Sequence, residues 1–255
     1  MSELIYEKKG NIAYVTLNRP EKLNAISLEL ADALQEACCQ IDRDPDVWAG
    51  IVTGAGDRSF SAGADLNALD KLVEEGRAHV WEAGCVLAYM AVKKPLIAAI
   101  NGYCLGGGLQ LALACDLRIA SQNAQFGTPD QKINTVDSFV SLALPYMIPS
   151  AIAMELILTG DFIDANEAYR VGLVNKVVSQ DELLPEATRM AERIFKNGPQ
   201  AIKAVKQLSR RGRALSLEIG LELFEALAIK ILDMEDTREA IKAFWEKRPP
   251  VWKGR

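Results

Sequence analysis

Hydrophobic and polar positions form short strand-like runs in the first half of the chain and longer helical patterns in the second half. Runs at 4–8 and 12–18 flank Lys9-Gly10-Asn11, a combination typical of a β-hairpin. An amphipathic helix is expected from an N-cap at Ser27 to about Asp42. Further short strands are predicted at 49–53, 96–100, 117–120, 124–127 and 174–178.

Helical periodicity dominates after about Ser138. Within this part of the chain, Gly160 is expected to end one helix. Earlier helical segments are predicted at 66–92, with a break near Gly76, and at 106–115. Later helices are predicted at 165–170, 182–195, 199–210, 215–232 and 237–247. This order predicts an α/β core of repeated strand-strand-helix units at 1–195. A helical region at 196–255 is expected to pack on that core or on a neighbouring subunit.

Charge and cysteine usage exclude several classes of protein. A net charge of -5 over 255 residues argues against nucleic acid or an anionic membrane as the main partner. No apolar run is long enough to span a bilayer, and the first residues do not form a secretory signal. The five cysteines are odd in number and form no C-x-x-C pattern, so reduced thiols and a cytoplasmic location are expected. They are Cys38, Cys39, Cys85, Cys104 and Cys115.

The single histidine, His79, limits the available catalytic chemistry. A Ser-His-Asp or Cys-His arrangement would have to use this residue, and a site with several histidine ligands is impossible. No metal site is therefore expected. His79 lies in a polar helical stretch and is interpreted as an ordinary surface or loop residue, with a place near the substrate as the alternative.

A glycine run follows the predicted strand at 96–100 and opens a short helix. Gly106, Gly107 and Gly108 have no side chains, so a ligand can approach the backbone closely. The start of the helix offers unpaired N–H groups with a partial positive charge, which suits a carbonyl oxygen. One turn inside the helix is Gln110, an amide that forms hydrogen bonds but does not exchange protons at neutral pH.

Several ordered pieces of sequence resemble one family along nearly the whole chain. They are Leu17-Asn18-Arg19-Pro20 with Leu23-Asn24-Ala25, Phe60-Ser61-Ala62-Gly63-Ala64-Asp65, Asn101-Gly102-Tyr103 with Leu105-Gly106-Gly107-Gly108, Ala124-Gln125-Phe126-Gly127 with Pro129, Leu158-Thr159-Gly160, and Gly172-Leu173-Val174 with Val177-Val178. In order and spacing they resemble the enoyl-CoA hydratase/isomerase (crotonase) superfamily. The resemblance implies a crotonase-like spiral of ββα units and an acyl-CoA thioester substrate. Coenzyme A then belongs to the substrate, no other cofactor is needed, and a homotrimer or dimer of trimers is expected.

By resemblance, two backbone N–H groups polarise the thioester carbonyl, at the matching positions Ala64 and Gly107. Such donors act on the enolate oxygen that develops in the transition state. The alternative interpretation is that both loops are only tight turns. Further substrate and CoA contacts are implied at Lys22, Leu23, Ala25, Ala62, Asp65, Leu66 and Gly106. The tail at 243–255 resembles that of carnitinyl-CoA dehydratases, and there Phe244 and Lys247 match positions that hold the nucleotide end of CoA.

The acid–base positions depart from the family pattern. Hydratases of the family have two glutamates where this chain has Gln110 and Asp130. Gln110 can hold a water but cannot act as a general acid or base. Asp130 keeps a carboxylate with a reach shortened by about 1.5 Å, which can cost about 10²-fold if the substrate does not move to meet it.

A second carboxylate, Asp137, stands seven residues beyond Asp130. If one residue is deleted in this loop, Asp137 matches an aspartate of dienoyl-CoA isomerases and carnitinyl-CoA dehydratases. The alternative is that it caps the following helix. Phe139 and Val140 replace a family glycine pair and should reshape the acyl pocket.

The favoured function is hydration or dehydration of a non-standard, cyclic or polar enoyl-CoA through a thioester enolate. Asp130 and Asp137 are the candidate proton carriers, with Gln110 beside them. Isomerisation of an enoyl-CoA or dienoyl-CoA double bond is the first alternative, because moving one proton needs fewer carboxylates. Acyl-CoA hydrolysis and a catalytically inactive CoA-binding homologue are the further alternatives.

Overall fold

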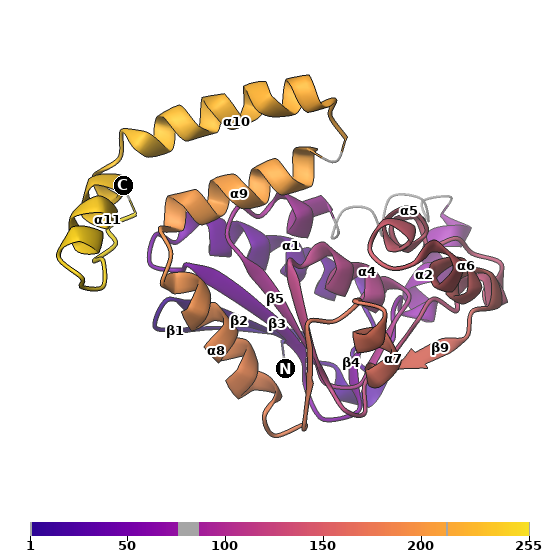
Figure 1. Cartoon of the computed structure of the whole chain (residues 1–255). Helices are drawn as coiled ribbons and strands as arrows, with labels where there is room; N and C mark the ends of the chain where they lie inside the picture. The colour runs from indigo at the N-terminus through magenta and orange to yellow at the C-terminus, as the bar shows by residue number, and fades with distance from the viewer. Residues whose placement is uncertain (1, 76–86, 213, 255) are drawn as a thin grey trace. The chain divides into compact units, whose positions relative to one another are not determined.

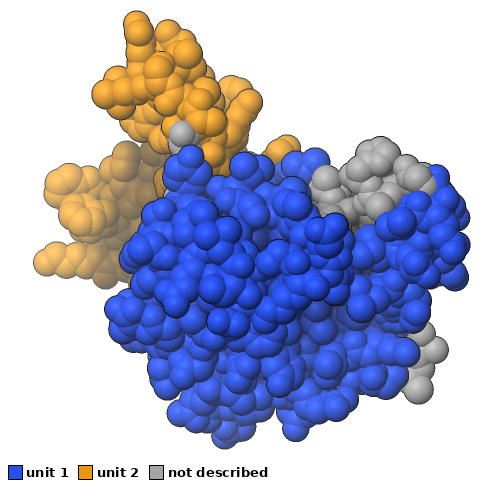
Figure 2. Space-filling view, turned by 90° about the vertical axis from the view of Figure 1, so that its right-hand side faces the viewer, with its two compact units in different colours: residues 1–92, 96–188 blue, residues 93–95, 189–255 orange. Residues whose placement is uncertain are grey.

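The computed structural model describes residues 2–75, 87–212 and 214–254. Contacts within the chain divide it into two compact units, coloured separately in Figure 2. The first unit comprises residues 1–92 and 96–188, and the second comprises residues 93–95 and 189–255. The boundary between residues 188 and 189 falls within helix α8 (Leu183–Phe195).

The first unit contains a six-stranded sheet with the order β1-β2-β3-β5-β7-β10. Its strands are β1 (Leu4–Lys9), β2 (Ile12–Leu17), β3 (Ala49–Gly54), β5 (Leu96–Ile100), β7 (Leu117–Ser121) and β10 (Lys176–Val178). The hairpin β1–β2 is antiparallel, as predicted, and the other pairs are parallel. Every residue of β3 and β5 is buried, as is typical of parallel strands covered on both faces. Helix α1 (Leu28–Arg43) covers one face and contacts β1 and β2 (Figure 1).

A second sheet of four short strands has the order β4-β6-β8-β9. These strands are β4 (Ser59–Ser61), β6 (Tyr103–Leu105), β8 (Gln125–Gly127) and β9 (Phe162–Asp164). In the pairs β3/β4, β5/β6 and β7/β8, the first strand joins the large sheet and the second joins the small one. The helix that follows completes each unit, so the predicted ββα repeat is confirmed.

The helices of the first unit begin and end mostly where capping residues predict. Ser27 accepts a hydrogen bond from the Leu30 N–H at the start of α1, and Gly160 adopts a left-handed conformation after α6. Besides α1 and α6 (Ser150–Thr159), this unit contains α2 (Leu66–Glu74), α4 (Gly107–Ala114), α5 (Ser138–Ala143) and α7 (Ala165–Arg170), and the 3₁₀ turns η1 (Pro20–Lys22), η2 (Asp130–Ile133) and η3 (Leu144–Tyr146).

Three features expected from the sequence lie outside the described residues: the helix break near Gly76, His79 and Cys85. The other four cysteines are free thiols. Within the described ranges, no helix combines the length and hydropathy needed to cross a bilayer.

The second unit is helical, with α9 (Pro199–Gly212), α10 (Leu217–Leu232) and α11 (Glu235–Trp245). Helices α9 and α10 pack against each other. Several large apolar side chains of α10 are exposed, namely Leu217, Ile219, Leu221, Phe224, Ile229 and Leu232. The helix therefore presents an apolar surface rather than a wholly polar one.

Candidate active site

The loops that carry Ala64 and Gly107 lie against each other in the first unit. A β-carbon added to Gly107 would lie 3.6 Å from the Ala64 nitrogen, and one added to Gly63 would lie 3.2 Å from the Gly107 nitrogen. Both Ala64 and Gly107 are half-buried. Within the described part of the chain, neither backbone N–H donates to a protein acceptor. The two N–H groups thus lie on neighbouring loops.

The Ala64 loop is held by parallel pairing with the segment before α1. The Ile26 N–H donates to the Gly63 carbonyl at 2.8 Å, and the Asp65 N–H donates to the Ile26 carbonyl at 2.9 Å. These two bonds fix the peptide units on both sides of Ala64. The orientation of the Ala64 N–H is therefore set by backbone pairing.

Arg19 ties together the two segments that pair at Ala64. Its Nη1 donates to the Ala25 carbonyl at 2.7 Å, and its Nη2 lies 2.9 Å from Asp65 Oδ2. A third contact joins Arg19 Nε to Glu3 Oε1 at 3.0 Å, and the arginine side chain is only 13% exposed. The planar guanidinium suits three contacts at fixed angles.

Asp65 has a second role as the N-cap of α2, where Oδ1 accepts a hydrogen bond from the Asn67 N–H at 3.0 Å. Burial alone would raise the pKa of this carboxyl. The Arg19 hydrogen bond and charge, with the backbone N–H of Asn67, outweigh burial and lower the pKa below its ordinary value. Asp65 is therefore held as a carboxylate next to Ala64.

The Gly107 loop is fixed by the small sheet. The Gly106 N–H donates to the Gly127 carbonyl at 3.0 Å, where β6 meets β8. Gly106 has φ 47° and ψ -120°, a conformation that side chains rarely adopt. A β-carbon on Gly108 would clash with the Ser61 carbonyl oxygen, so α4 begins in direct contact with β4.

Asp130 places its carboxylate over this same glycine. A β-carbon on Gly106 would lie 3.0 Å from Asp130 Oδ2 and 3.3 Å from Oδ1. The Thr128 hydroxyl donates to Oδ2 at 3.0 Å. The backbone carbonyl of Asp130 accepts hydrogen bonds from the Thr135 N–H at 3.1 Å and from its hydroxyl at 3.0 Å. The carboxylate thus lies next to the residue that precedes the Gly107 donor.

Gln110 and Asp137 are both deeply buried. Gln110 is 1% exposed on α4, and its N–H donates to the Gly106 carbonyl, so it lies one helical turn from the donor loop. Asp137 is 3% exposed and caps α5, because its Oδ1 accepts the Val140 N–H at 2.8 Å. The capping interaction is therefore present, while proton transfer by Asp137 stays a prediction.

The other predicted contacts in the first unit surround the Ala64 loop. The Ala62 N–H donates to the Leu23 carbonyl at 3.0 Å, and Leu23 itself has a left-handed φ of 52°. The Ala25 N–H donates to the carbonyl of Lys22, whose side chain is exposed. Leu66 is the exposed first residue of α2. The structure thus joins the segments at 22–25 and 62–66.

Phe244 and Lys247 lie in the second unit, at the end of α11 and just beyond it. Phe244 is 75% exposed and stacks edge-on against Trp245, with ring centroids 5.5 Å apart. Lys247 is exposed and has a left-handed φ of 53° where the chain leaves the helix. Both side chains are available to a ligand.

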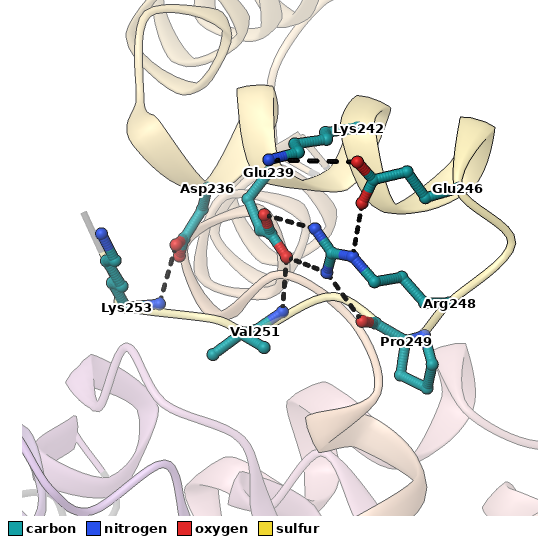
Figure 3. Close-up of polar contacts among 8 residues, drawn as sticks. All are labelled: Asp236, Glu239, Lys242, Glu246, Arg248, Pro249, Val251 and Lys253. Atoms are coloured by element: carbon teal, nitrogen blue, oxygen red, sulfur yellow. Dashed lines mark hydrogen bonds and ion pairs between the residues drawn. The ribbon is translucent and has the colours of Figure 1, made fainter.

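The tail after Lys247 is folded back along α11 (Figure 3). Arg248 lies between Glu239 and Glu246, with nitrogen–oxygen distances of 2.6 Å and 2.7 Å. The Val251 N–H donates to Glu239 at 2.9 Å. Asp236 accepts the backbone N–H groups of Lys253 at 2.7 Å and of Gly254 at 2.8 Å. Arg248 and the Val251 N–H lower the pKa of Glu239 to about 2.

Sequence reasoning did not assign roles to Arg19 and Thr128. Arg19 belongs to a quoted motif, but its contacts with Glu3 and Asp65 depend on the tertiary fold. Thr128 lies two residues before Asp130, and its hydroxyl bonds the Asp130 side chain rather than the backbone. Local capping and turn patterns do not predict such a contact between two side chains.

The site combines two backbone N–H groups on neighbouring loops with a carboxylate beside one of them. Such donors stabilise an oxyanion, and the carboxylate can move a proton next to it. Within the described residues, no group of three or more histidine, cysteine, aspartate or glutamate side chains could hold a metal ion. The arrangement is compatible with the oxyanion hole and adjacent acid–base group expected from the sequence, and both roles stay predictions.

Comparison with protein families and curated proteins gives a consistent result. Residues 7–255 match the family model described as enoyl-CoA hydratase/isomerase. The chain is 41% identical over 250 residues to (E)-benzylidenesuccinyl-CoA hydratase of Thauera aromatica, covering 97% of this chain and 98% of the relative. It is 40% identical to carnitinyl-CoA dehydratase of Salmonella enteritidis PT4 (strain P125109), over the full length of both.

Solved structures show the same fold. An enoyl-CoA hydratase from Bacillus anthracis superposes with a TM-score of 0.94 at 33% identity, covering 99% of this chain and 100% of the other. An enoyl-CoA hydratase from Mycobacterium tuberculosis H37Rv gives a TM-score of 0.92 at 37% identity, with both chains fully covered. The fold class predicted from the sequence is confirmed.

Proposed function

Because the chain belongs to the enoyl-CoA hydratase/isomerase family, we propose that it adds water to an enoyl-CoA thioester, or removes it, through an enolate. The observation that carries this proposal is the proximity of the Ala64 and Gly107 loops to each other, with the Asp130 carboxylate over Gly106. The thioester oxygen accepts both N–H bonds. As the enolate forms, its negative charge strengthens both bonds, which favours the transition state over the ground state.

Asp130 is the proposed proton carrier. In hydration it takes a proton from water while the water oxygen bonds to the β-carbon, and electrons move onto the thioester oxygen. Asp130 then returns that proton to the α-carbon as the enolate collapses. One carboxylate is enough for the whole reaction, because Asp130 takes one proton from water and gives one proton to the α-carbon, and so ends in its starting state. The Gln110 amide holds the water by hydrogen bonds, and Asp137 is the proposed second carboxylate.

The proposed acyl group is non-standard, cyclic or polar. Two full-length relatives are named for carnitinyl-CoA and (E)-benzylidenesuccinyl-CoA, neither of which is a simple linear enoyl-CoA. The chain also has Gln110 and Asp130 where hydratases of the family have two glutamates, and the bulkier Phe139 and Val140 in place of a glycine pair. These differences support a substrate whose position in the pocket suits a shorter carboxylate.

Double-bond isomerisation is the second candidate. It is favoured by the amide at Gln110, because moving one proton between two carbons needs no activated water, and Asp130 alone can carry that proton. The products separate the two functions. Hydration adds the mass of water, whereas isomerisation in deuterated water exchanges hydrogen for deuterium without that addition.

We propose further that the second unit contributes to CoA binding and assembly. The exposed Phe244 and Lys247 are proposed to hold the nucleotide end of a CoA, often across a subunit boundary, as the family resemblance implies. The exposed Lys22 of the first unit is proposed to meet CoA phosphates. The exposed apolar side chains of α10 support assembly into a homotrimer or dimer of trimers. The mechanism uses no cofactor beyond the CoA of the substrate, and the free thiols support a cytoplasmic location.

The test is turnover of a panel of linear, cyclic, dienoyl and polar acyl-CoA thioesters by the purified chain, followed by mass spectrometry. We expect a product 18 Da heavier than at least one cyclic or polar enoyl-CoA, and weaker turnover of linear substrates. A product with a shifted double bond and no added water would instead assign double-bond isomerisation as the function. Failure to convert any thioester would refute both.

A further inference from the structure

Thr128 contacts the carboxylate on which the proposed chemistry depends. It follows β8, is 2% exposed, and its hydroxyl donates to Asp130 Oδ2 at 3.0 Å. The preceding residue, Gly127, accepts the Gly106 N–H at 3.0 Å. Thr128 is therefore anchored to the same strand end that anchors the donor loop, and it connects that strand end to the carboxylate.

This contact restricts the rotation of the Asp130 side chain. An aspartate carboxyl can rotate about its Cβ–Cγ bond through a broad range of angles. A hydrogen bond from a buried hydroxyl to one named oxygen selects one orientation, because leaving that hydroxyl unpaired would cost free energy. In the observed orientation both carboxylate oxygens lie over Gly106. A shorter side chain tolerates little misplacement, since the substrate must come to it.

We propose that Thr128 is a positioning residue that holds the Asp130 carboxylate against the Gly106–Gly107 loop. The role rests on the proposed function of Asp130 in proton transfer. Thr128 does not touch the reacting atoms. It keeps the Asp130 carboxylate at a fixed position relative to the N–H groups that bind the enolate oxygen. This fixed position compensates in part for the methylene that aspartate lacks relative to glutamate.

The test compares two replacements of similar size. Thr128→Val keeps the shape and removes the hydroxyl, whereas Thr128→Ser keeps the hydroxyl. We expect kcat to fall about 10- to 100-fold in Thr128→Val with KM changed less than about 3-fold. In Thr128→Ser kcat should stay within about 3-fold of the unmodified protein. A purely structural role would change stability without this division between kcat and KM.

Thr53→Val is the matched control. Thr53 is also buried, and its hydroxyl donates to the Ala99 carbonyl at 2.8 Å within the large sheet rather than to a carboxylate of the candidate site. Its replacement should lower the unfolding midpoint and leave kcat unchanged. Unaltered kcat in Thr128→Val, or an equal loss in Thr128→Ser, would overturn the proposal.

A second measurement does not depend on turnover. Crystal structures of both variants should show the Asp130 carboxylate displaced from Gly106 in Thr128→Val and retained in Thr128→Ser. A carboxylate that keeps its place in Thr128→Val refutes the positioning role, even if every thioester of the panel is left unconverted. The absence of any thioester conversion refutes the proposed function, whereas an unmoved carboxylate in Thr128→Val refutes the positioning role. The two failures are therefore distinguishable.

Discussion

The Arg19 guanidinium lies 2.9 Å from the Asp65 carboxylate and also donates to the Ala25 carbonyl, so it joins the two segments that pair at Ala64. We predict that Arg19→Lys lowers kcat about 10-fold with little change in KM, because an ammonium cannot reproduce contacts made at three fixed angles. Steady-state kinetics on the converted thioester measures this effect.

Arg170→Lys is the control for the loss of a paired arginine. Arg170 forms two 2.6 Å contacts with Glu167 on an exposed surface of α7. Exposed ion pairs contribute little, so this variant should match the unmodified protein in kcat. Equal kinetic losses in the two variants would remove the assigned role of Arg19.

Gly106→Ala should abolish most activity. The added β-carbon would meet Asp130 Oδ2 at 3.0 Å, and the positive φ would cost about 1–3 kcal/mol of stability. Displacement of the carboxylate should lower kcat at least about 100-fold. Gly10→Ala places a β-carbon at another positive φ with no atom within 4 Å. It should reduce stability alone, and wild-type kcat in Gly106→Ala would contradict the geometry.

Replacement of Asp137 separates its cap from its proposed catalytic role. Asparagine caps helices about as well as aspartate, so Asp137→Asn should preserve the unfolding midpoint. We expect kcat to fall about 10-fold or more if the carboxyl moves protons, since general acid–base groups contribute at least this much. Asp137→Ala should also lose about 1 kcal/mol of stability. Full turnover in Asp137→Asn would leave capping as its only role.

The tail cluster predicts a pH-dependent stability. The pKa of Glu239 falls from 4.5 to about 2 in the folded chain, chiefly through its hydrogen bonds with Arg248. A lowered folded-state pKa stabilises the fold above pH 4.5, and this contribution is lost as pH falls toward 2.

The excess unfolding midpoint of the unmodified protein over Glu239→Gln should therefore shrink as the pH is lowered below 4.5. Glu36→Gln is the control, because Glu36 accepts a neutral amide bond from Gln40. A difference that is constant from pH 7 to about pH 3 would count against the Glu239–Arg248 pairing.

Much of the fold follows from local patterns. The Ser27 cap of α1 and the helical patterns of α1 and α7 predict their bounds closely, because helical periodicity and capping chemistry are local signals. The strands β4, β6 and β9 escaped prediction. Each has three residues, too few to show an alternating pattern, and each is defined by neighbours distant in sequence.

Some features of the candidate site are likewise predictable from local sequence, and others depend on the tertiary fold. The small residues around Ala64 and Gly107 indicate close backbone approach, and the structure brings the two loops together. The contact between Asp130 and Gly106 depends on the pairing of β6 with β8, which no local pattern specifies. Arg19 reaches Asp65 only in the folded chain, so its role could not be inferred from spacing.

The position of isotopes in the product tests the central claim most directly. Hydration of a converted enoyl-CoA in deuterated water enriched in oxygen-18 should place one oxygen-18 on the β-carbon and one deuterium on the α-carbon. Asp130→Asn should lower the rate of both about 10²-fold or more, because the amide cannot carry the proton. Oxygen-18 found in a released carboxylic acid, or full hydration by Asp130→Asn, would contradict an enolate mechanism served by Asp130.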